Sequence, residues 1–178
     1  MKIWKLIVAV IFIGSSSLSG ATAQEIDRDA NRALEKFNKE LKGAVSFVQN
    51  DVKALLIFPS IVKAGIGIGG EYGEGVLRIK GKSNIYYSTA SASVGLQFGV
   101  QEKSMIIAFM TQAALDKFLK SDGWEVGVDG SVTLIDVGMA KNISTQRINK
   151  PVVGFVFNNK GLMYNLTIEG SKFTKIVR

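Results

Sequence analysis

The chain contains no histidine and no cysteine among its 178 residues. Nucleophilic catalysis of the Ser-His-Asp or Cys-His type and the usual zinc sites need an imidazole or a thiolate, so the composition excludes them. Disulfides are excluded as well, so packing must hold the fold. Proline is scarce (2) and glycine abundant (19), a balance that favours tight turns and close strand packing. We therefore expect a protein that is not an enzyme and that binds no cofactor or metal.

The first 23 residues have the layout of a secretory signal peptide. Lys2 and Lys5 give a basic start, an apolar run follows from Leu6 to Ile13, and Ala21-Thr22-Ala23 forms an A-x-A cleavage pattern. The run is far shorter than the roughly 20 residues that span a bilayer as a helix, and no later stretch is long and apolar enough to do so. We expect an exported protein, periplasmic or secreted, whose single domain covers residues 24–178.

The expected mature domain is basic. Removing residues 1–23 deletes two lysines and no acid, which leaves 20 basic and 15 acidic side chains, a balance of +5. A basic surface suits anionic lipid or nucleic acid, and export makes lipid the expected partner, with no nucleic acid. The alternative is that the charge only keeps the protein in solution.

The segment from Asp27 to Phe58 shows helical periodicity, with apolar residues at spacings of three and four and charged residues on the other face. We predict an amphipathic arm that breaks near Gln49-Asn50, resumes as a second helix capped by Asp51, and stops at Pro59. Such an arm either docks on its own sheet or lies in a membrane interface. The residues expected to contact lipid in the second case are Phe37, Leu41 and Val45.

After Pro59 the pattern changes to strands. From Ile85 to Val100 it alternates, and we predict that the face with Tyr86 and Val100 points into the core while the small polar face with Tyr87 points to solvent. Thr111 is expected to cap a short helix, Gln112 to Lys120. Further strands are expected at 61–69, 75–80, 104–110, 124–134, 152–157 and 162–168. The elements predict one α+β domain, an antiparallel sheet of about six to seven strands with an N-terminal helical arm.

A glycine-rich segment in this region literally matches the G-x-G-x-x-G pattern of dinucleotide sites. Such a site needs a helix to begin at the pattern, but a β pattern follows it, so we predict a glycine-lined strand and turn and no nucleotide. Glu71 and Glu74 could form a carboxylate pair for acid–base catalysis; we expect them instead to be solvated or paired with Lys63 or Arg78. The glycines of the segment are Gly65, Gly67, Gly69, Gly70, Gly73 and Gly75.

Several ordered blocks carry a family resemblance. They are Val52 to Gly65 with Gly67 to Leu77, Ser93 to Gln101, Phe109 to Phe118, and Lys160 to Leu162 with Ile168 to Ser171. Together they resemble the SYLF domain, also called the Ysc84 or Las17-binding-protein domain, from about residue 28 to 176. Ala54 departs from the pattern, since the family usually has glycine there. The resemblance implies binding of phosphoinositides and other acidic lipids, and no catalytic residues. Eukaryotic members also bind actin, a partner that an exported protein is not expected to meet.

We therefore predict a lipid-binding protein of the cell envelope that recognises acidic phospholipid through a basic patch and the amphipathic helix. Three alternatives stay open: an envelope scaffold that binds protein or peptide, a small outer-membrane β-barrel, and a carboxylate enzyme. The basic residues expected to attract the head groups are Lys63, Arg78, Lys80 and Lys82.

Overall fold

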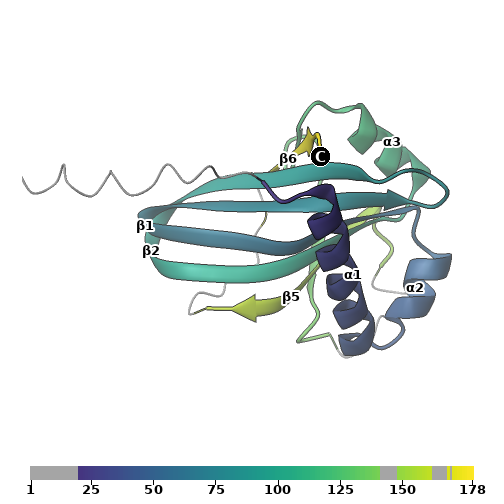
Figure 1. The fold of residues 1–178 in the computed structure, drawn as a ribbon, viewed down its shortest axis with the longest axis horizontal. Helices are drawn as coiled ribbons and strands as arrows, with labels where there is room; N and C mark the ends of the chain where they lie inside the picture. Colours follow the sequence, from purple (N-terminus) through teal and green to yellow (C-terminus); the bar gives the residue numbers. More distant parts are fainter. Residues whose placement is uncertain (1–19, 141–147, 162–167, 169) are drawn as a thin grey trace, which may run out of the picture.

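The computed structural model describes residues 20–140, 148–161, 168 and 170–178, and for 93–98 it describes the backbone. Within these residues, two helices precede two very long strands, and one helix and four shorter strands follow (Figure 1). The elements are α1 (Ala23–Glu40), α2 (Ala44–Asn50), β1 (Ala54–Ile79), β2 (Ile85–Phe109), α3 (Gln112–Lys120), β3 (Trp124–Glu125), β4 (Thr133–Asp136), β5 (Val152–Lys160) and β6 (Lys172–Ile176). The predicted class, a single α+β domain with a largely antiparallel sheet and an N-terminal helix, is confirmed.

Strands β1 and β2 form one antiparallel ribbon, which pairs from Ala54 with Phe109 to Leu77 with Ile85. The ribbon folds back on itself in the middle, at the end farthest from α2 and α3 in Figure 1. Its register shifts between Ile66 and Ile68, and Gly67 and Gly99 have φ angles of 71° and 115°, which glycine adopts without steric cost. The fold-back creates a first layer, residues 54–66 with 99–109, and a second layer, residues 68–79 with 85–94.

Strand β2 has a different second neighbour on each of its halves. β6 pairs with Tyr86 to Ala90 in the second layer, and β5 pairs with Glu102 to Phe109 in the first. β3 extends the sheet beyond β6, and β4 joins β5 as the one parallel pair among the described strands. The order is β3-β6-β2-β5-β4, with β1 also paired to β2.

Two glycines let the two layers approach closely. A Cβ on Gly73 would lie 2.7 Å from the carbonyl oxygen of Ser60, and one on Gly75 would overlap the carbonyl oxygen of Ile57. Neither glycine has a positive φ, so the requirement is one of space and not of backbone conformation. Together with the fold-back at Gly67, this confirms the predicted glycine-lined strand and turn.

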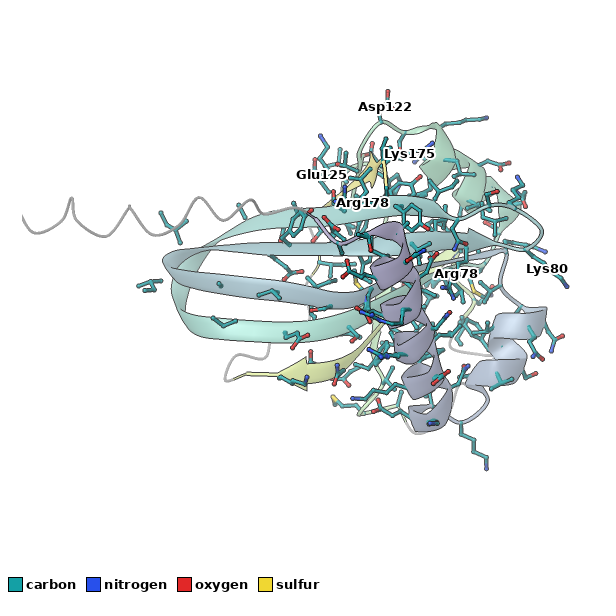
Figure 2. The ribbon with its side chains drawn as sticks, in the orientation of Figure 1. Arg78, Lys80, Asp122, Glu125, Lys175 and Arg178 are labelled. Carbon is teal, nitrogen blue, oxygen red and sulfur yellow. The ribbon has the colours of Figure 1, made fainter. Side chains whose placement is uncertain are left out.

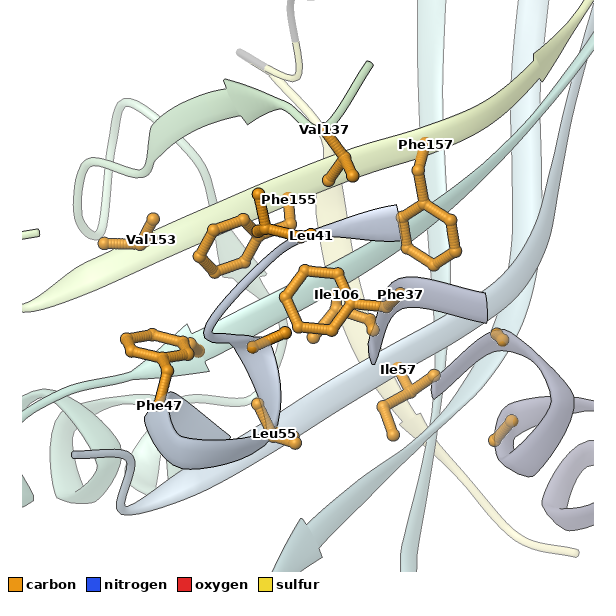
Figure 3. Close-up of a cluster of buried hydrophobic side chains, with 14 of the residues drawn as sticks. Phe37, Leu41, Phe47, Leu55, Ile57, Ile106, Val137, Val153, Phe155 and Phe157 are labelled. Atoms are coloured by element: carbon orange, nitrogen blue, oxygen red, sulfur yellow. The ribbon is translucent and has the colours of Figure 1, made fainter. Parts of the chain in front are cut away.

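Apolar side chains pack on both faces of the first layer. On the outer face, the ring centroid of Phe37 in α1 lies 5.0 Å from that of Phe155 and 5.9 Å from that of Phe157 (Figure 3). Between the layers, Phe58 stacks on Phe173 at 5.5 Å, and Phe118 of α3 closes that cluster. The arm is therefore docked on its sheet. None of the helices in the described part of the chain is long and apolar enough to cross a membrane.

The predicted second helix, capped by Asp51 and running through Leu56, is wrong. The arm breaks between Leu41 and Gly43 and not near Gln49-Asn50, Asp51 is the C-cap of α2, and Ala54 already begins β1. Leu56, Ile57 and Phe58 are each fully buried, since α1 covers one face of this strand and the second layer covers the other. An apolar run that is buried on both faces is typical of a central strand. Pro59 lies at the irregularity between Phe58 and Ile61, where β1 shifts register, and does not end a helix.

The predicted core face of β2 is also wrong. Tyr87 and Thr89 are 5% and 1% exposed, whereas Ala90, Ala92 and Val100 face solvent. The fold-back encloses this polar face: Tyr87 joins the aromatic cluster beside Phe118, and the smaller Thr89 lies nearer the fold-back. The predicted strand 124–134 reduces to β3 and the start of β4, β6 was not predicted, and most of the predicted strand 162–168 lies outside the described residues.

Substituting Gly75 should test the close approach of the layers. We expect Gly75→Ala to lower the free energy of unfolding by about 1–3 kcal/mol, because the new methyl group must displace the backbone of Ile57. In Gly70→Ala the Cβ would meet only the carbonyl oxygen of Ser91 at 3.8 Å, so a change within about 0.5 kcal/mol is expected. Urea unfolding of the two variants measures both values, and equal effects would contradict the packing described.

Candidate functional site

Glu71 of the glycine-rich segment forms a buried ion pair with Lys103. The Nζ atom of Lys103 lies 3.0 Å from Oε1 and 3.1 Å from Oε2 of Glu71, and both side chains are more than nine-tenths buried. Glu71 belongs to the second layer and Lys103 to the first, so the pair joins the two layers from inside. The expectation that Glu71 is solvated or paired with Lys63 or Arg78 is therefore wrong.

Glu74 joins three separate parts of the chain. Arg178 donates to its carboxylate, the Tyr72 hydroxyl donates to Oε1 at 2.7 Å, and the Ala21 N–H donates to Oε2 at 3.0 Å. Burial raises the pKa of Glu74, but the hydrogen bonds from Arg178 and Tyr72 outweigh it, so the pKa lies below its usual 4.5. The expectation that Glu74 is solvated or paired with Lys63 or Arg78 is therefore also wrong.

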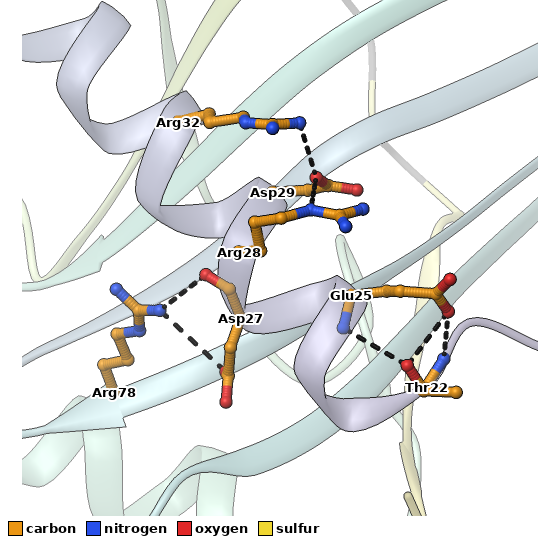
Figure 4. A network of polar contacts seen from close by, with 7 residues as sticks. All are labelled: Thr22, Glu25, Asp27, Arg28, Asp29, Arg32 and Arg78. Carbon is orange, nitrogen blue, oxygen red and sulfur yellow. Dashed lines mark hydrogen bonds and ion pairs between the residues drawn. The ribbon is translucent and has the colours of Figure 1, made fainter.

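Arg78 holds the first turns of α1 against the ribbon. Its guanidinium donates to the Oδ1 atom of Asn31 at 2.7 Å. It also donates to the carbonyl of Asp27 at 3.2 Å and lies 3.9 Å from the Asp27 carboxylate (Figure 4). The helix itself begins with a capping box between Thr22 and Glu25. Hydrogen bonds from the backbone and side chain of Thr22 lower the pKa of Glu25. Arg78 is thus engaged in a structural contact.

A groove of about 620 Å³ lies between the end of α2 and the two ends of β1. Lys53, Arg78 and Lys80 line it, and none of its lining residues is acidic. Because Arg78 turns toward α1, the ammonium groups of Lys53 and Lys80 are the cations left to a ligand. Both lysines are exposed, and no ion pair involves them within the described residues. Lys82 is also exposed, in the turn that follows β1. We call this groove with Lys82 the basic groove.

The fold places two of the four predicted basic residues in the lining of the groove. Arg78 and Lys80 line it, and Figure 2 shows them at the end of the ribbon opposite the fold-back. Lys82 follows two residues after Lys80, in the turn beyond β1. Lys63 is elsewhere: it is half-buried on the inward side of the first layer, paired in register with Gln101. Lys53 is a groove residue that the sequence analysis missed. It directly precedes the buried run at Ala54, so recognising that run as a strand would have placed Lys53 at the same end.

The helical residues predicted to contact lipid are divided by the fold. Phe37 and Leu41 are fully buried in the core under α1, so their assignment to lipid contact is wrong for this conformation. Val45 is 48% exposed on α2. The groove therefore offers mainly positive charge to a ligand. The ammonium groups of Lys53 and Lys80, with Lys82 nearby, suit a phosphate or carboxylate group. The apolar Val52 and Leu55 in the same lining suit an apolar chain attached to that group.

The buried pair should be far more sensitive than a surface pair. We expect Lys103→Met to destabilise the protein by about 3–5 kcal/mol, because it leaves the Glu71 carboxylate buried without a partner. The double variant Glu71→Met, Lys103→Met should recover much of that loss. The matched control is Lys160→Met, which breaks the exposed pair with Glu102 and should cost about 1 kcal/mol or less. Urea unfolding measures all three, and a double variant no more stable than Lys103→Met would argue against the pairing.

The Glu74 contact should make stability depend on acid pH. Its pKa is lower in the folded than in the unfolded chain, so its stabilisation is present above about pH 4.5 and is lost as the pH falls through the folded value. We expect Arg178→Gln to lower the urea midpoint at pH 7 and to have a progressively smaller effect below pH 4.5. Lys175→Gln makes the same charge change at an exposed site and should show little pH dependence. A difference between Arg178→Gln and the parent that stays constant down to pH 3 would contradict this.

Comparison with known proteins adds one finding. Residues 90–176 match the family model described as Ysc84, Las17-binding protein actin regulator, and no curated protein matches the chain. The earlier resemblance, drawn from about residue 28 to 176, is thus supported over its second half. The matched segment begins within β2 and runs through α3 to the end of β6. From residue 90 to residue 176, the chain is therefore similar to the Ysc84 family of Las17-binding actin regulators.

Proposed function

We propose that this protein binds acidic phospholipid at a membrane surface and has no enzymatic activity. The observation that carries the proposal is the basic groove, where Lys53, Lys80 and Lys82 are exposed and no acidic residue lines the wall. The similarity of residues 90–176 to the Ysc84 family supports it, through the acidic-lipid binding that the SYLF resemblance implies. So does the +5 balance of residues 24–178.

The proposal extends the family domain to α1, α2 and β1. Strand β1 pairs with β2 along nearly its whole length, and α1 covers the outer face of the first layer. The matched segment therefore lacks the strand that completes its own sheet. This pairing favours one domain that includes the whole ribbon and the groove.

Non-enzymatic binding also accounts for the two carboxylates of the glycine-rich segment. Glu71 is paired with Lys103 inside the ribbon, and Glu74 is held by Arg178 and Tyr72. Glu74 lines a pocket of about 270 Å³ and Glu71 does not, so the two carboxylates do not form an acid–base pair at one pocket. We propose an exported protein that is peripheral on a membrane of the envelope, for which actin is not a partner.

Vesicle binding tests the electrostatic part of the proposal. Each lysine near an anionic surface contributes about 1 kcal/mol, so Lys53→Gln, Lys80→Gln, Lys82→Gln should weaken binding to phosphatidylglycerol-containing vesicles about a hundredfold. The matched control carries Lys117→Gln, Lys120→Gln and Lys175→Gln, which remove the same charge from other exposed sites. It should lose only a few-fold. Co-sedimentation over a lipid titration gives both affinities.

Two results would contradict the proposal. Equal binding of the parent protein to phosphatidylcholine and phosphatidylglycerol vesicles, or none to either, would exclude recognition of acidic lipid. An equal loss in the two triple variants would assign the attraction to net charge and not to the groove. Raising the salt concentration should weaken binding of the parent more than that of the groove variant, because screening acts on the removed contacts.

A further inference from the structure

The folded end of the ribbon presents an apolar surface to solvent. We call it the ribbon tip, residues 62–72 of β1 and 89–101 of β2. Ile66 and Ile68 are 76% and 73% exposed, and Val100 is 64% exposed. The described outward residues are Val62, Ala64, Ile66, Ile68, Gly70, Tyr72, Ala90, Ala92 and Val100. Contiguous exposed apolar surface of this kind marks a binding site in water-soluble proteins.

The inside of the tip is polar. Lys63 and Glu71 are the only charged residues in its sequence, and both lie on the inward side, where Glu71 pairs with Lys103. Thr89 and Gln101 are buried at 1% and 4% exposure. Apolar residues outside and polar residues inside reverse the usual arrangement of a protein in water.

The outward surface of the tip carries no charge. Val62 of the first layer and Tyr72 of the second line one pocket beside the start of α1, so the outward faces of the two layers meet along this edge. Ile66, Ile68 and Val100 continue the apolar surface toward the fold-back. A surface that no outward charge interrupts suits the hydrocarbon of a bilayer, which offers a charged group no partner.

We propose that the ribbon tip inserts into the acyl-chain boundary of a lipid bilayer. This inference rests on the proposed membrane binding and names the part of the chain that enters the membrane. Tyr72 marks the depth: its ring is half-exposed at the base of the tip, and its hydroxyl donates to Glu74. Tyrosine is enriched at membrane interfaces for such an arrangement. From Val62 to Ile66 the strand rises about 13 Å, which suits shallow insertion.

Site-specific fluorescence tests the insertion directly, because the chain has no native cysteine. Ile68→Cys and Val128→Cys in the full chain would each carry a nitrobenzoxadiazole label. Val128 is the matched control, 74% exposed and outside the ribbon. With vesicles of phosphatidylcholine and phosphatidylglycerol, we expect a blue shift and quenching by acyl-chain spin labels at position 68 and neither at 128.

A second variant measures the energetic contribution. Ile66→Thr, Ile68→Thr keeps β-branched side chains in the strand and should weaken vesicle binding about tenfold or more, with Val128→Thr as the control. Both positions are exposed, so the unfolding midpoint in urea should change little. The basic groove lies at the other end of the ribbon and is unchanged in these variants.

The outcomes separate this inference from the proposed function. Vesicle binding with a water-like label at position 68 would overturn insertion and leave acidic-lipid binding intact. Absence of vesicle binding would overturn both. A label that responds to protein concentration without vesicles, together with dimers in sedimentation velocity, would assign the tip to a second copy of the chain and overturn insertion.

Discussion

The close approach of the two layers at Gly73 and Gly75 is the constraint on which the rest of the structure depends. Because backbone meets backbone there, the ribbon encloses a narrow space that large side chains enter only near its helical end. Toward the fold-back, that space holds an ion pair and small polar groups instead of rings. The outer face of the first layer is not covered by the ribbon itself. Helix α1 covers it and packs Phe37 against it. Helix docking, buried charge and apolar exterior thus follow from one packing requirement.

The sequence predicts elements whose cause is local. The helix from Gln112 with its Thr111 cap is found where it was predicted. The glycine-rich segment was predicted to be a strand because no helical pattern follows it, and it lies within β1. The sequence does not predict which face of β2 is enclosed. Alternation shows which residues share a face, but the fold-back decides which face is inside. The strand from Ala54 was missed because the run from Leu55 to Phe58 is apolar throughout. Such a run shows neither the period of a helix nor that of a strand, so it was assigned to the preceding helix.

The candidate site divides in the same way. Arg78, Lys80 and Lys82 are close in the sequence, so their clustering was predictable; Lys53 comes from the other end of β1 and joins them only through the fold. The amphipathic pattern of α1 is the same whether the helix docks or enters a membrane interface, so the sequence could not decide the fate of Phe37 and Leu41. Glu71 finds its partner in Lys103, on the other strand of the ribbon, because pairing register and fold-back place them together.

The length of the second layer has a consequence for orientation. Ile68 and Lys80 are separated by about twelve residues of strand, roughly 40 Å at the usual rise, a distance close to the full thickness of a bilayer with its head groups. A rigid body of this length brings both ends to one flat membrane only when its long axis lies in the membrane plane. Standing upright with the fold-back at one surface, it would hold the groove about 40 Å away, within reach of a second surface. The folded ribbon is thus a spacer of fixed length, and for the proposed membrane contacts its tilt would decide whether they fall on one membrane or on two.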